Sequence, residues 1–233
     1  MKAALLICDH VPEELSKIHG TYIEMYADLF PAIALEAYFV IDNEFPELEE
    51  YDIFISTGSR YSVYDDIPWI EKLKKMVKEI YDLRKIFIGI CFGHQLIAES
   101  LGGKVERHQS GYLIGVHDFK FNHKLSWMKP GADGYKILML CQDQITALPK
   151  GSLVLSKSAE CAIGMYTVGS TFLGIQGHPD FSKEYNKAIF ESRADRIDSD
   201  KIEKANKSLG EEPSLILLRS YMHNFILGQT NNR

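Results

Sequence analysis

The segment around Cys91 is the part of the sequence that most plainly suggests chemistry. The segment Gly89-Ile90-Cys91-Phe92-Gly93-His94-Gln95 carries an apolar run directly, with no loop, into a helix-like segment. Such a strand–turn–helix junction is a nucleophile elbow, which projects its side chain from the carboxyl edge of a sheet. A helix N-terminus also favours the thiolate form of a cysteine. The pattern predicts a cysteine nucleophile; the alternative is a small cysteine buried in the core.

A base and an orienting acid for this nucleophile occur together later in the chain. In Gly174-Ile175-Gln176-Gly177-His178-Pro179-Asp180, an apolar run ends at a histidine, and a carboxylate follows two residues later. A cysteine nucleophile needs a base, and the base needs an acceptor that orients it. His178 and Asp180 are the candidates for these roles, and an ordinary turn with an Asx-type bond is the alternative.

A third candidate feature is the loop Thr57-Gly58-Ser59-Arg60, which follows the apolar run 51–56. If this run is a strand of the same sheet, the loop lies at its carboxyl end and its backbone amides face the cysteine. Amides in that position form an oxyanion hole. Taken alone, the loop would be interpreted as a plain glycine turn.

Hydrophobic periodicity predicts the strands and helices that carry these residues. Strands are predicted at 2–8, 35–41, 51–56 and 85–90, and helices at 15–29, from Pro68 onward and at 92–101. Strands that alternate with helices of this kind indicate βαβ units. The predicted fold class is therefore α/β, with a mostly parallel sheet flanked by helices.

The second half of the chain has a different pattern. Short β-like runs separated by Gly and Pro turns occur at 112–121, 136–140, 153–155, 162–166 and 172–175. We interpret them as antiparallel strands added to the same sheet. Residues 182–227 are predicted to be helical, with a break at 210–213. Because there is no internal repeat and no low-complexity linker, we predict a single domain over residues 1–233.

Composition narrows the classes of partner. The 26 basic and 32 acidic side chains give a net charge of −6, which argues against nucleic-acid binding and favours a small-molecule or protein partner. The apolar runs fall far short of the roughly 20 residues that span a bilayer. The N-terminus lacks the apolar core of a secretory signal, so we expect no membrane contact and a cytoplasmic location.

The sequence carries no motif for a nucleotide cofactor or a metal ion. There is no GxGxxG motif, and Ser156 stands where a phosphate loop beginning at Gly151 requires its second glycine. The four cysteines show no CxxC pairing and no metal-ligand spacing. We therefore predict free thiols, no cofactor and no metal.

Together, these segments resemble the class I glutamine amidotransferases, which carry a Cys, His and Glu triad. The elbow is similar to the family's Gly-x-Cys-x-Gly-x-Gln, and residues 176–180 are similar to its Gln-Gly-His-Pro-Glu. Residues 56–65 resemble its Ser-Gly-Gly-Pro-x-Ser-Val-Tyr-Asp segment, and residues 142–151 resemble its His-Gln-Asp-Gln-Val segment with the trailing proline. The tail is similar to that of the stand-alone, GMP-synthase-like members. The resemblance covers essentially the whole chain and implies the flavodoxin-like form of the α/β fold.

The resemblance also implies a mechanism. Cys91 would attack the γ-carbonyl of glutamine or of a γ-glutamyl compound, His178 would pass a proton to the leaving nitrogen, and Asp180 would orient the imidazole. Water would then hydrolyse the glutamyl thioester. The oxyanion is assigned to the backbone amides of Phe92, Gly58 and Ser59, and the glutamyl group to Gln95 and Tyr112, with Cys141 nearby.

The sequence leaves the family pattern in three places. Asp180 replaces the usual Glu, which shortens the orienting arm by one methylene. Thr57 and Ser59 stand where the family tends to have Gly and Pro, so we expect a different loop conformation, because non-glycine residues disfavour positive φ. Cys141 takes the place of the His in His-Gln-Asp-Gln-Val and is interpreted first as a buried strand cysteine.

Three hypotheses of function stay open. The first is a glutaminase subunit that delivers ammonia to a separate synthase subunit, and the second is a free-standing γ-glutamyl peptidase. The third, motivated by the three departures, is a binding or regulatory module that keeps the fold without turnover. We predict one of the two enzymes.

Overall fold

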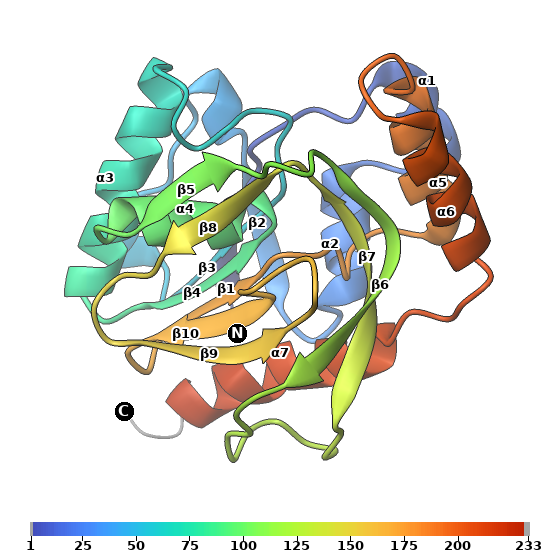
Figure 1. Ribbon diagram of the computed structural model, residues 1–233. Helices are drawn as coiled ribbons and strands as arrows, with labels where there is room; N and C mark the ends of the chain where they lie inside the picture. The colour runs from blue at the N-terminus through green and yellow to red at the C-terminus, as the bar shows by residue number, and fades with distance from the viewer. Residues whose placement is uncertain (1, 231–233) are drawn as a thin grey trace.

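The computed structural model describes residues 2–230, in which a nine-stranded sheet lies between two layers of helices (Figure 1). The strands of this sheet, in chain order, are β1 (Lys2–Leu6), β2 (Ala34–Tyr38), β3 (Ile53–Ser56), β4 (Ile86–Ile90), β6 (Leu113–Phe121), β7 (Gly134–Cys141), β9 (Ser152–Lys157), β10 (Met165–Val168) and β11 (Phe172–Ile175). The helices are α1 (Glu13–His19), α2 (Tyr22–Leu29), α3 (Pro68–Asp82), α4 (Phe92–Ser100), α5 (Lys183–Ser192), α6 (Ser199–Ser208) and α7 (Leu215–Thr230), with short 3-10 turns η1 (Val40–Asp42) and η2 (Leu48–Glu50).

The order of the strands puts the parallel ones together. Across the sheet it runs β2-β1-β3-β4-β11-β10-β9-β6-β7, and the pairings from β2 to β11 are all parallel. The pairings beyond β11 are antiparallel. The parallel part has the flavodoxin-like order 2-1-3-4-5, so the predicted α/β fold class is confirmed.

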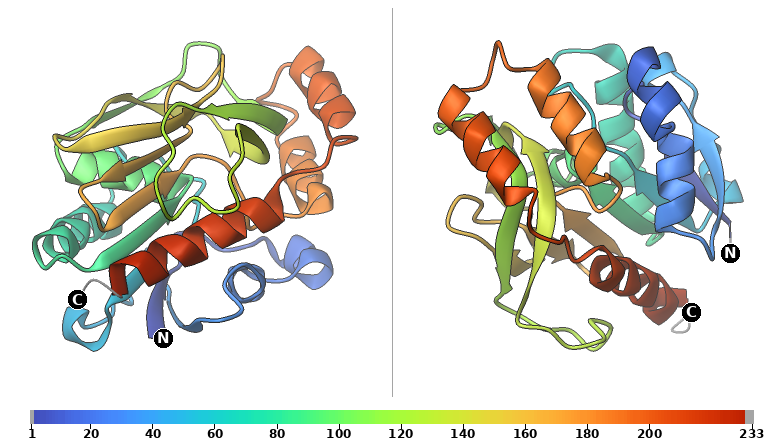
Figure 2. Two further views of the ribbon diagram at one scale, coloured as in Figure 1. Left: turned by 90° about the horizontal axis from the view of Figure 1, so that it is seen from below. Right: turned by 90° about the vertical axis from the view of Figure 1, so that its right-hand side faces the viewer.

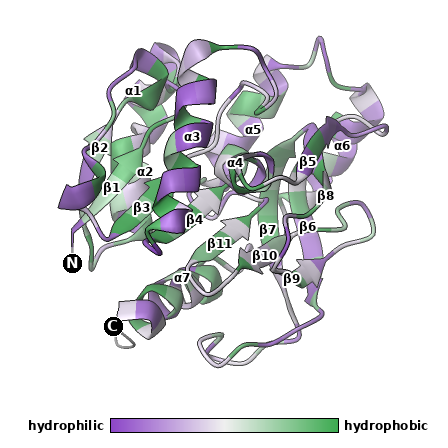
Figure 3. Cartoon of the chain, turned by 90° about the vertical axis from the view of Figure 1, so that its left-hand side faces the viewer, coloured by the Kyte–Doolittle hydropathy of each residue, from purple (hydrophilic) through white to green (hydrophobic). Residues whose placement is uncertain are grey.

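The inner parallel strands β1, β3, β4 and β11 are buried on both faces because helices cover both, whereas the edge strand β2 is only partly buried. In β1 and the residues after it, Ala3, Leu5 and Ile7 pack into the core on one face, and Ala4 and Leu6 pack into the core on the other. This alternation follows the two-residue period of a strand. The first core contains side chains from α2, α5 and α7, and the second contains side chains from α3 and α4. Figure 2 shows α7 lying along the sheet, and Figure 3 shows apolar strands between helices whose outer faces are hydrophilic.

Helix α3, which covers the face of the sheet that carries Ala4 and Leu6, shows how the sequence determines a helix. Pro68 stands in the first turn of α3, where its missing amide hydrogen costs nothing. The buried residues of α3 recur at steps of three and four and include Trp69, Leu73, Val77 and Ile80. The resulting apolar stripe fixes α3 against the sheet beside α4.

Three predictions about the elements need correction. The helix predicted at 15–29 is two helices, because Gly20 has φ +84° and ends α1, and Thr21 begins α2 with a capping box to Glu24. The strand at 172–175 is antiparallel to β10 but parallel to β4, at the centre of the sheet. Two short strands that the periodicity missed, β5 (Lys104–Arg107) and β8 (Asp143–Ala147), form a separate two-stranded sheet.

Candidate active site

Cys91 lies at a strained turn between β4 and α4. Its backbone has φ +52° and ψ −98°, a conformation that is costly for a non-glycine residue and that concentrates at functional sites. A Cβ on Gly89 would lie 2.3 Å from the backbone of Gly93, and one on Gly93 would lie 2.9 Å from Cβ of Ser56. Only glycines allow α4 to start this close to the strands. The predicted elbow geometry is therefore present.

His178 lies beside the elbow because β11 pairs with β4. Ile175 is in register with Ile90, and the amide of Cys91 donates a 2.9 Å hydrogen bond to the carbonyl oxygen of Ile175. The chain then turns, and the amide of His178 donates a 2.8 Å hydrogen bond to the carbonyl oxygen of Leu138. This hydrogen bond fixes the backbone position from which the imidazole side chain of His178 extends.

The side chain of Asp180 is fully buried beside His178. Its Oδ1 lies 3.3 Å from Nδ1 of His178, and neither carboxylate oxygen has a well-directed hydrogen bond among the described residues. The imidazole also stacks on Phe181, with ring centroids 3.9 Å apart and planes 10° apart. The ring is thus held by packing as well as by charge.

Two negative charges act on His178. Burial lowers the pKa of the imidazole, but the charges of Cys91 and Asp180 beside it raise that pKa to about 10. Cys91 acts more strongly than Asp180. The site therefore favours the protonated form of the imidazole.

The loop after β3 approaches the same point. A Cβ on Gly58 would lie 2.7 Å from Cε1 of His178 and 3.6 Å from Cβ of Cys91. Among the hydrogen bonds of the described residues, none is donated by the amides of Gly58 or Ser59. The amide of Phe92, at the start of α4, has no partner within its helix. The three amides assigned to the oxyanion are thus near Cys91 and available.

The conformation of this loop suits the non-glycine residues at 57 and 59. Thr57, Ser59 and Gly58 all keep ordinary φ values. Side chains hold the loop instead: the Thr57 hydroxyl accepts from the amide of Cys8 at 2.9 Å, and the Ser59 hydroxyl donates to the carbonyl of Cys8 at 2.8 Å. Glycine at 58 is required for space beside His178, not for positive φ.

The residues expected at the glutamyl group surround a cavity of about 60 Å³ that reaches Cys91. Gln95 lines it, and its amide nitrogen donates to the carbonyl of Asp143 at 2.8 Å and to Oε1 of Gln176 at 3.2 Å. Tyr112 and Cys141 also line it. Cys141 is a buried residue at the end of β7, and burial, with the nearby charge of Cys91, raises the pKa of its thiol.

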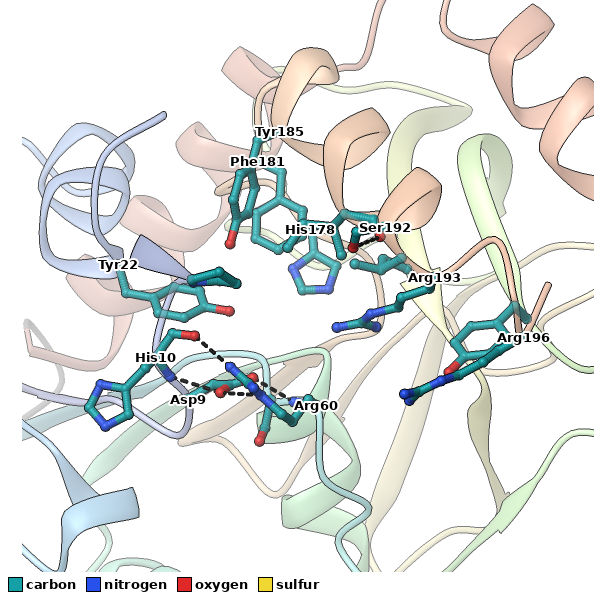
Figure 4. A pocket seen from close by; sticks show the side chains of 15 residues that line it. Asp9, His10, Tyr22, Arg60, His178, Phe181, Tyr185, Ser192, Arg193 and Arg196 are labelled. Atoms are coloured by element: carbon teal, nitrogen blue, oxygen red, sulfur yellow. Dashed lines mark hydrogen bonds and ion pairs between the residues drawn. The ribbon is translucent and has the colours of Figure 1, made fainter. Parts of the chain in front are cut away.

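A larger cavity of about 330 Å³ adjoins the first (Figure 4). The two share Ser59, Arg60, Tyr112, Leu140 and Arg193. Cys91 lines only the smaller cavity, and His178 lines only the larger. The thiol of Cys91 and the imidazole of His178 therefore lie on either side of the junction between the two cavities.

Sequence reasoning missed three residues of this region. Gln176 is fully buried, and its amide nitrogen lies 3.8 Å from Sγ of Cys91. Asp9 follows β1 and binds Arg60, and Arg193 comes from the end of α5. Gln176 lies within the motif that ends in His178, and Asp9 follows a buried strand, so the sequence held a signal for both. No local pattern marks Arg193.

The structure also bears on metal binding and on membrane spans. Within residues 2–230, no group of three or more His, Cys, Asp or Glu side chains is placed to hold a metal ion. No helix within this range is both long enough and apolar enough to cross a membrane.

Comparison with known proteins adds an independent line of evidence. Residues 32–195 match the family model for glutamine amidotransferase class-I. γ-Glutamyl peptidase 3 from Arabidopsis thaliana is 31% identical, over 96% of this chain and 95% of its own. A putative glutamine amidotransferase from Saccharomyces cerevisiae is 30% identical, over 78% of this chain and 80% of its own. The solved structure of a glutamine amidotransferase from Thermotoga maritima aligns with 96% of this chain and 97% of its own at a TM-score of 0.74 and 22% identity, which shows a common fold.

Proposed function

The chain belongs to the glutamine amidotransferase class-I family, and on that premise we propose that it is a cysteine hydrolase that cleaves the γ-amide bond of glutamine or of a γ-glutamyl compound. Catalysis is assigned to Cys91, His178 and Asp180. The relative from Arabidopsis is named a γ-glutamyl peptidase, which supports the free-standing enzyme over a subunit that serves a synthase.

In the first half of the proposed reaction, the thiolate of Cys91 attacks the γ-carbonyl carbon. A C–S bond forms, and the carbonyl oxygen becomes an oxyanion that accepts from the amides of Phe92, Gly58 and Ser59. The tetrahedral species then collapses as the C–N bond breaks. His178, which is protonated at neutral pH, gives its proton to the leaving nitrogen, so an amine or ammonia departs.

The second half hydrolyses the glutamyl thioester. Neutral His178 takes a proton from water, whose oxygen attacks the thioester carbon, and the C–S bond breaks to release glutamate and the Cys91 thiolate. Asp180 stabilises the imidazolium and holds the ring in one orientation. Aspartate suffices for this role because its Oδ1 already lies 3.3 Å from Nδ1 of His178.

The observation that carries the proposal is the close approach at Gly58. A Cβ atom on Gly58 would lie 2.7 Å from Cε1 of His178 and 3.6 Å from Cβ of Cys91. Gly58 belongs to the loop whose amides are assigned to the oxyanion. Nucleophile, base and oxyanion donors thus come from the carboxyl ends of three neighbouring strands, β4, β11 and β3. Structural packing alone does not require a glycine, a histidine and a cysteine to meet in this way.

Release of glutamate by the purified chain tests the proposal. Glutamine and a γ-glutamyl dipeptide are compared as substrates, with Cys91→Ser as the inactive variant and Cys161→Ser as the matched control. Turnover that disappears in Cys91→Ser and persists in Cys161→Ser is expected. Turnover that survives in Cys91→Ser would refute the assignment of the nucleophile. Its absence from the unmodified chain with both substrates would refute a free-standing enzyme and favour either a subunit that requires a synthase or a non-catalytic module.

Three further assignments form part of this proposal. All four cysteines are free thiols, as a cytoplasmic protein would have them. The chain is taken as one domain over residues 1–233, without a cofactor. An ammonia-accepting synthase subunit stays a prediction that the same assay addresses, because such a subunit would be needed for turnover.

A further inference from the structure

The larger cavity beside His178 carries more positive than negative charge. Arg60, Arg193 and Arg196 line it, and Asp9 is the one acidic side chain among its described lining residues. Asp9 is already engaged, because it accepts from Nε of Arg60 at 2.7 Å, from the amide of Arg60 at 2.8 Å and from the amide of His10 at 2.8 Å. Its charge therefore offsets Arg60 and leaves Arg193 and Arg196 without an acidic partner among the residues that line the cavity.

Arg193 is the arginine best placed to act on a ligand. It caps the C-terminal end of α5, and Figure 4 shows its guanidinium group between His178 and Arg60, directed into the cavity. No ion pair to it occurs among residues 2–230. Arg196 lies farther out and pairs with Asp195 at 3.5 Å, where both side chains are exposed. A half-buried guanidinium without a carboxylate partner is prepared to bind one.

A buried phenol faces the same space. The side chain of Tyr185 is 1% exposed, and its hydroxyl has no hydrogen-bond partner of normal length and angle among the described residues. Burial and the charges of Asp180 and Asp9 raise the pKa of this phenol, whereas a contact with the Tyr22 hydroxyl and the charge of Arg193 act in the opposite direction. In Figure 4 the hydroxyls of Tyr185 and Tyr22 both point into the cavity. A buried hydroxyl without a partner is costly, and a ligand oxygen would remove that cost.

The position of the larger cavity relative to the scissile bond determines which part of the substrate the cavity holds. Cys91 opens on the smaller cavity together with Gln95, and His178 opens on the larger. The proton donor faces the leaving nitrogen, so whatever is attached to that nitrogen enters the cavity of about 330 Å³. Ammonia would leave this space unused, whereas an amino acid or a dipeptide would fill much of it.

We propose that Arg193, with the hydroxyls of Tyr185 and Tyr22, forms a subsite for the carboxylate of the leaving group, so that the preferred substrates are γ-glutamyl amino acids or γ-glutamyl dipeptides with a free C-terminal carboxylate. This subsite rests on the proposed function, since it presumes that the bond is broken between Cys91 and His178. A guanidinium and phenol hydroxyls donate charge-assisted hydrogen bonds to a carboxylate.

Three substrates distinguish this subsite from the rest of the site. γ-Glutamyl-alanine carries the carboxylate, γ-glutamyl-alaninamide has the same size without the charge, and glutamine lacks the leaving residue. We expect the unmodified chain to prefer the free acid over the amide by roughly 10- to 100-fold in kcat/KM, as charged hydrogen bonds allow. Arg193→Gln should abolish the preference, and Tyr185→Phe should reduce it by about 3- to 10-fold.

Lys187→Gln is the matched control. Lys187 lies on α5 as well, pairs with Glu191 at 3.4 Å and does not line the cavity, so it should keep the full preference. An equal loss on all three substrates in Arg193→Gln would overturn the subsite, because it would place the arginine on the glutamyl group. No preference for the acid in the unmodified chain would overturn it as well.

Calorimetric binding of the same compounds to Cys91→Ser separates the two proposals. Tighter binding of the acid than of the amide, lost in Cys91→Ser/Arg193→Gln, would support the subsite even if no turnover were found, and then the proposed function would fail alone. Turnover without any preference for the acid would overturn the subsite and leave the proposed function standing.

Discussion

Gly58 and His178 approach each other so closely that a methyl group on Gly58 would lie 2.7 Å from Cε1 of the imidazole. Real Cβ atoms do not tolerate that distance, so either the ring or the loop would have to move. The imidazole ring cannot move freely, because it stacks on Phe181 with ring centroids 3.9 Å apart. The backbone amide of His178 also donates a hydrogen bond to the carbonyl oxygen of Leu138. Glycine at 58 thus sets the separation between the base and the oxyanion loop.

Gly58→Ala should therefore lower kcat by about 100-fold or more, because a displacement of about 1 Å in an active site costs on this order. The backbone at Gly58 has an ordinary φ, so we expect a folded variant with little change in its circular dichroism spectrum. Gly131→Ala is the matched control, since a Cβ there meets nothing within 4 Å. Full activity in Gly58→Ala would show that the loop and the imidazole do not act together.

The pH dependence of kcat/KM should report His178. Its pKa is raised to about 10, so the proton that the leaving nitrogen needs is bound at neutral pH and is lost as the pH rises through about 10. Activity should fall over that interval. Asp180→Asn removes one of the charges that raise this pKa, so the fall should move to lower pH.

Titration of the imidazole by NMR in ¹⁵N-histidine-labelled protein measures the same group directly. Asp133→Asn serves as the control, because Asp133 is exposed and pairs with Lys124. An alkaline limb that stays in place in Asp180→Asn would mean that Asp180 does not act on His178 electrostatically.

The parts of the site that the sequence revealed are those encoded in short segments. Cys91 and its flanking glycines mark the elbow, because the close contact between α4 and β4 needs glycine at both positions. The parallel pairing of β11 with β4 was not predicted, since periodicity identifies a strand but not its neighbour. That pairing is what brings His178 to Cys91.

Other features were hidden for different physical reasons. The apolar stripe of 15–29 continues across Gly20, so the helix break was visible only in the capping box of Thr21 and Glu24. Arg193 ends a charged helix and has no local signal. It reaches the site because α5 packs over the carboxyl edge of the sheet, and this is a consequence of tertiary structure.

Alkylation by iodoacetamide at pH 7.5 should modify Cys91 before the other three cysteines. Burial raises the pKa of Cys8 and of Cys161 to about 12 and also raises that of Cys141, so these thiols are protonated and unreactive. Peptide mass spectrometry identifies the modified residue. Preferential labelling of any other cysteine would contradict the assignment of the nucleophile.

Gln176 should influence the rate of that alkylation. Its amide nitrogen lies 3.8 Å from Sγ of Cys91, and Gln176→Leu removes this hydrogen bond at similar volume. We expect alkylation to slow by about 3- to 10-fold, as for the loss of one weak hydrogen bond. Gln109→Leu, at an exposed loop position, should leave the rate unchanged. Equal rates in the two variants would mean that the amide does not stabilise the thiolate.

Replacing Asp9 should lower both the free energy of unfolding of the chain and its kcat. Its buried carboxylate accepts from the amides of His10 and Arg60 and from Nε of Arg60, so one side chain fixes the end of the loop that contains Gly58. Asp9→Asn replaces an acceptor oxygen by a donor and removes the charge. We expect it to lower the free energy of unfolding by about 1.5–3 kcal/mol, the range for hydrogen bonds to a charged group.

The same variant should lower kcat, because an unanchored loop no longer holds the oxyanion amides in place. Asp42→Asn is the control: Asp42 pairs with His10 at 3.0 Å, but both side chains are about half exposed, and such pairs contribute at most about 1 kcal/mol. Urea unfolding and glutamate release measure the two effects on the same preparations. If Asp9→Asn lost stability but kept its full kcat, the anchor would serve the fold alone, and the oxyanion loop would have to be held by Thr57 and Ser59 through Cys8.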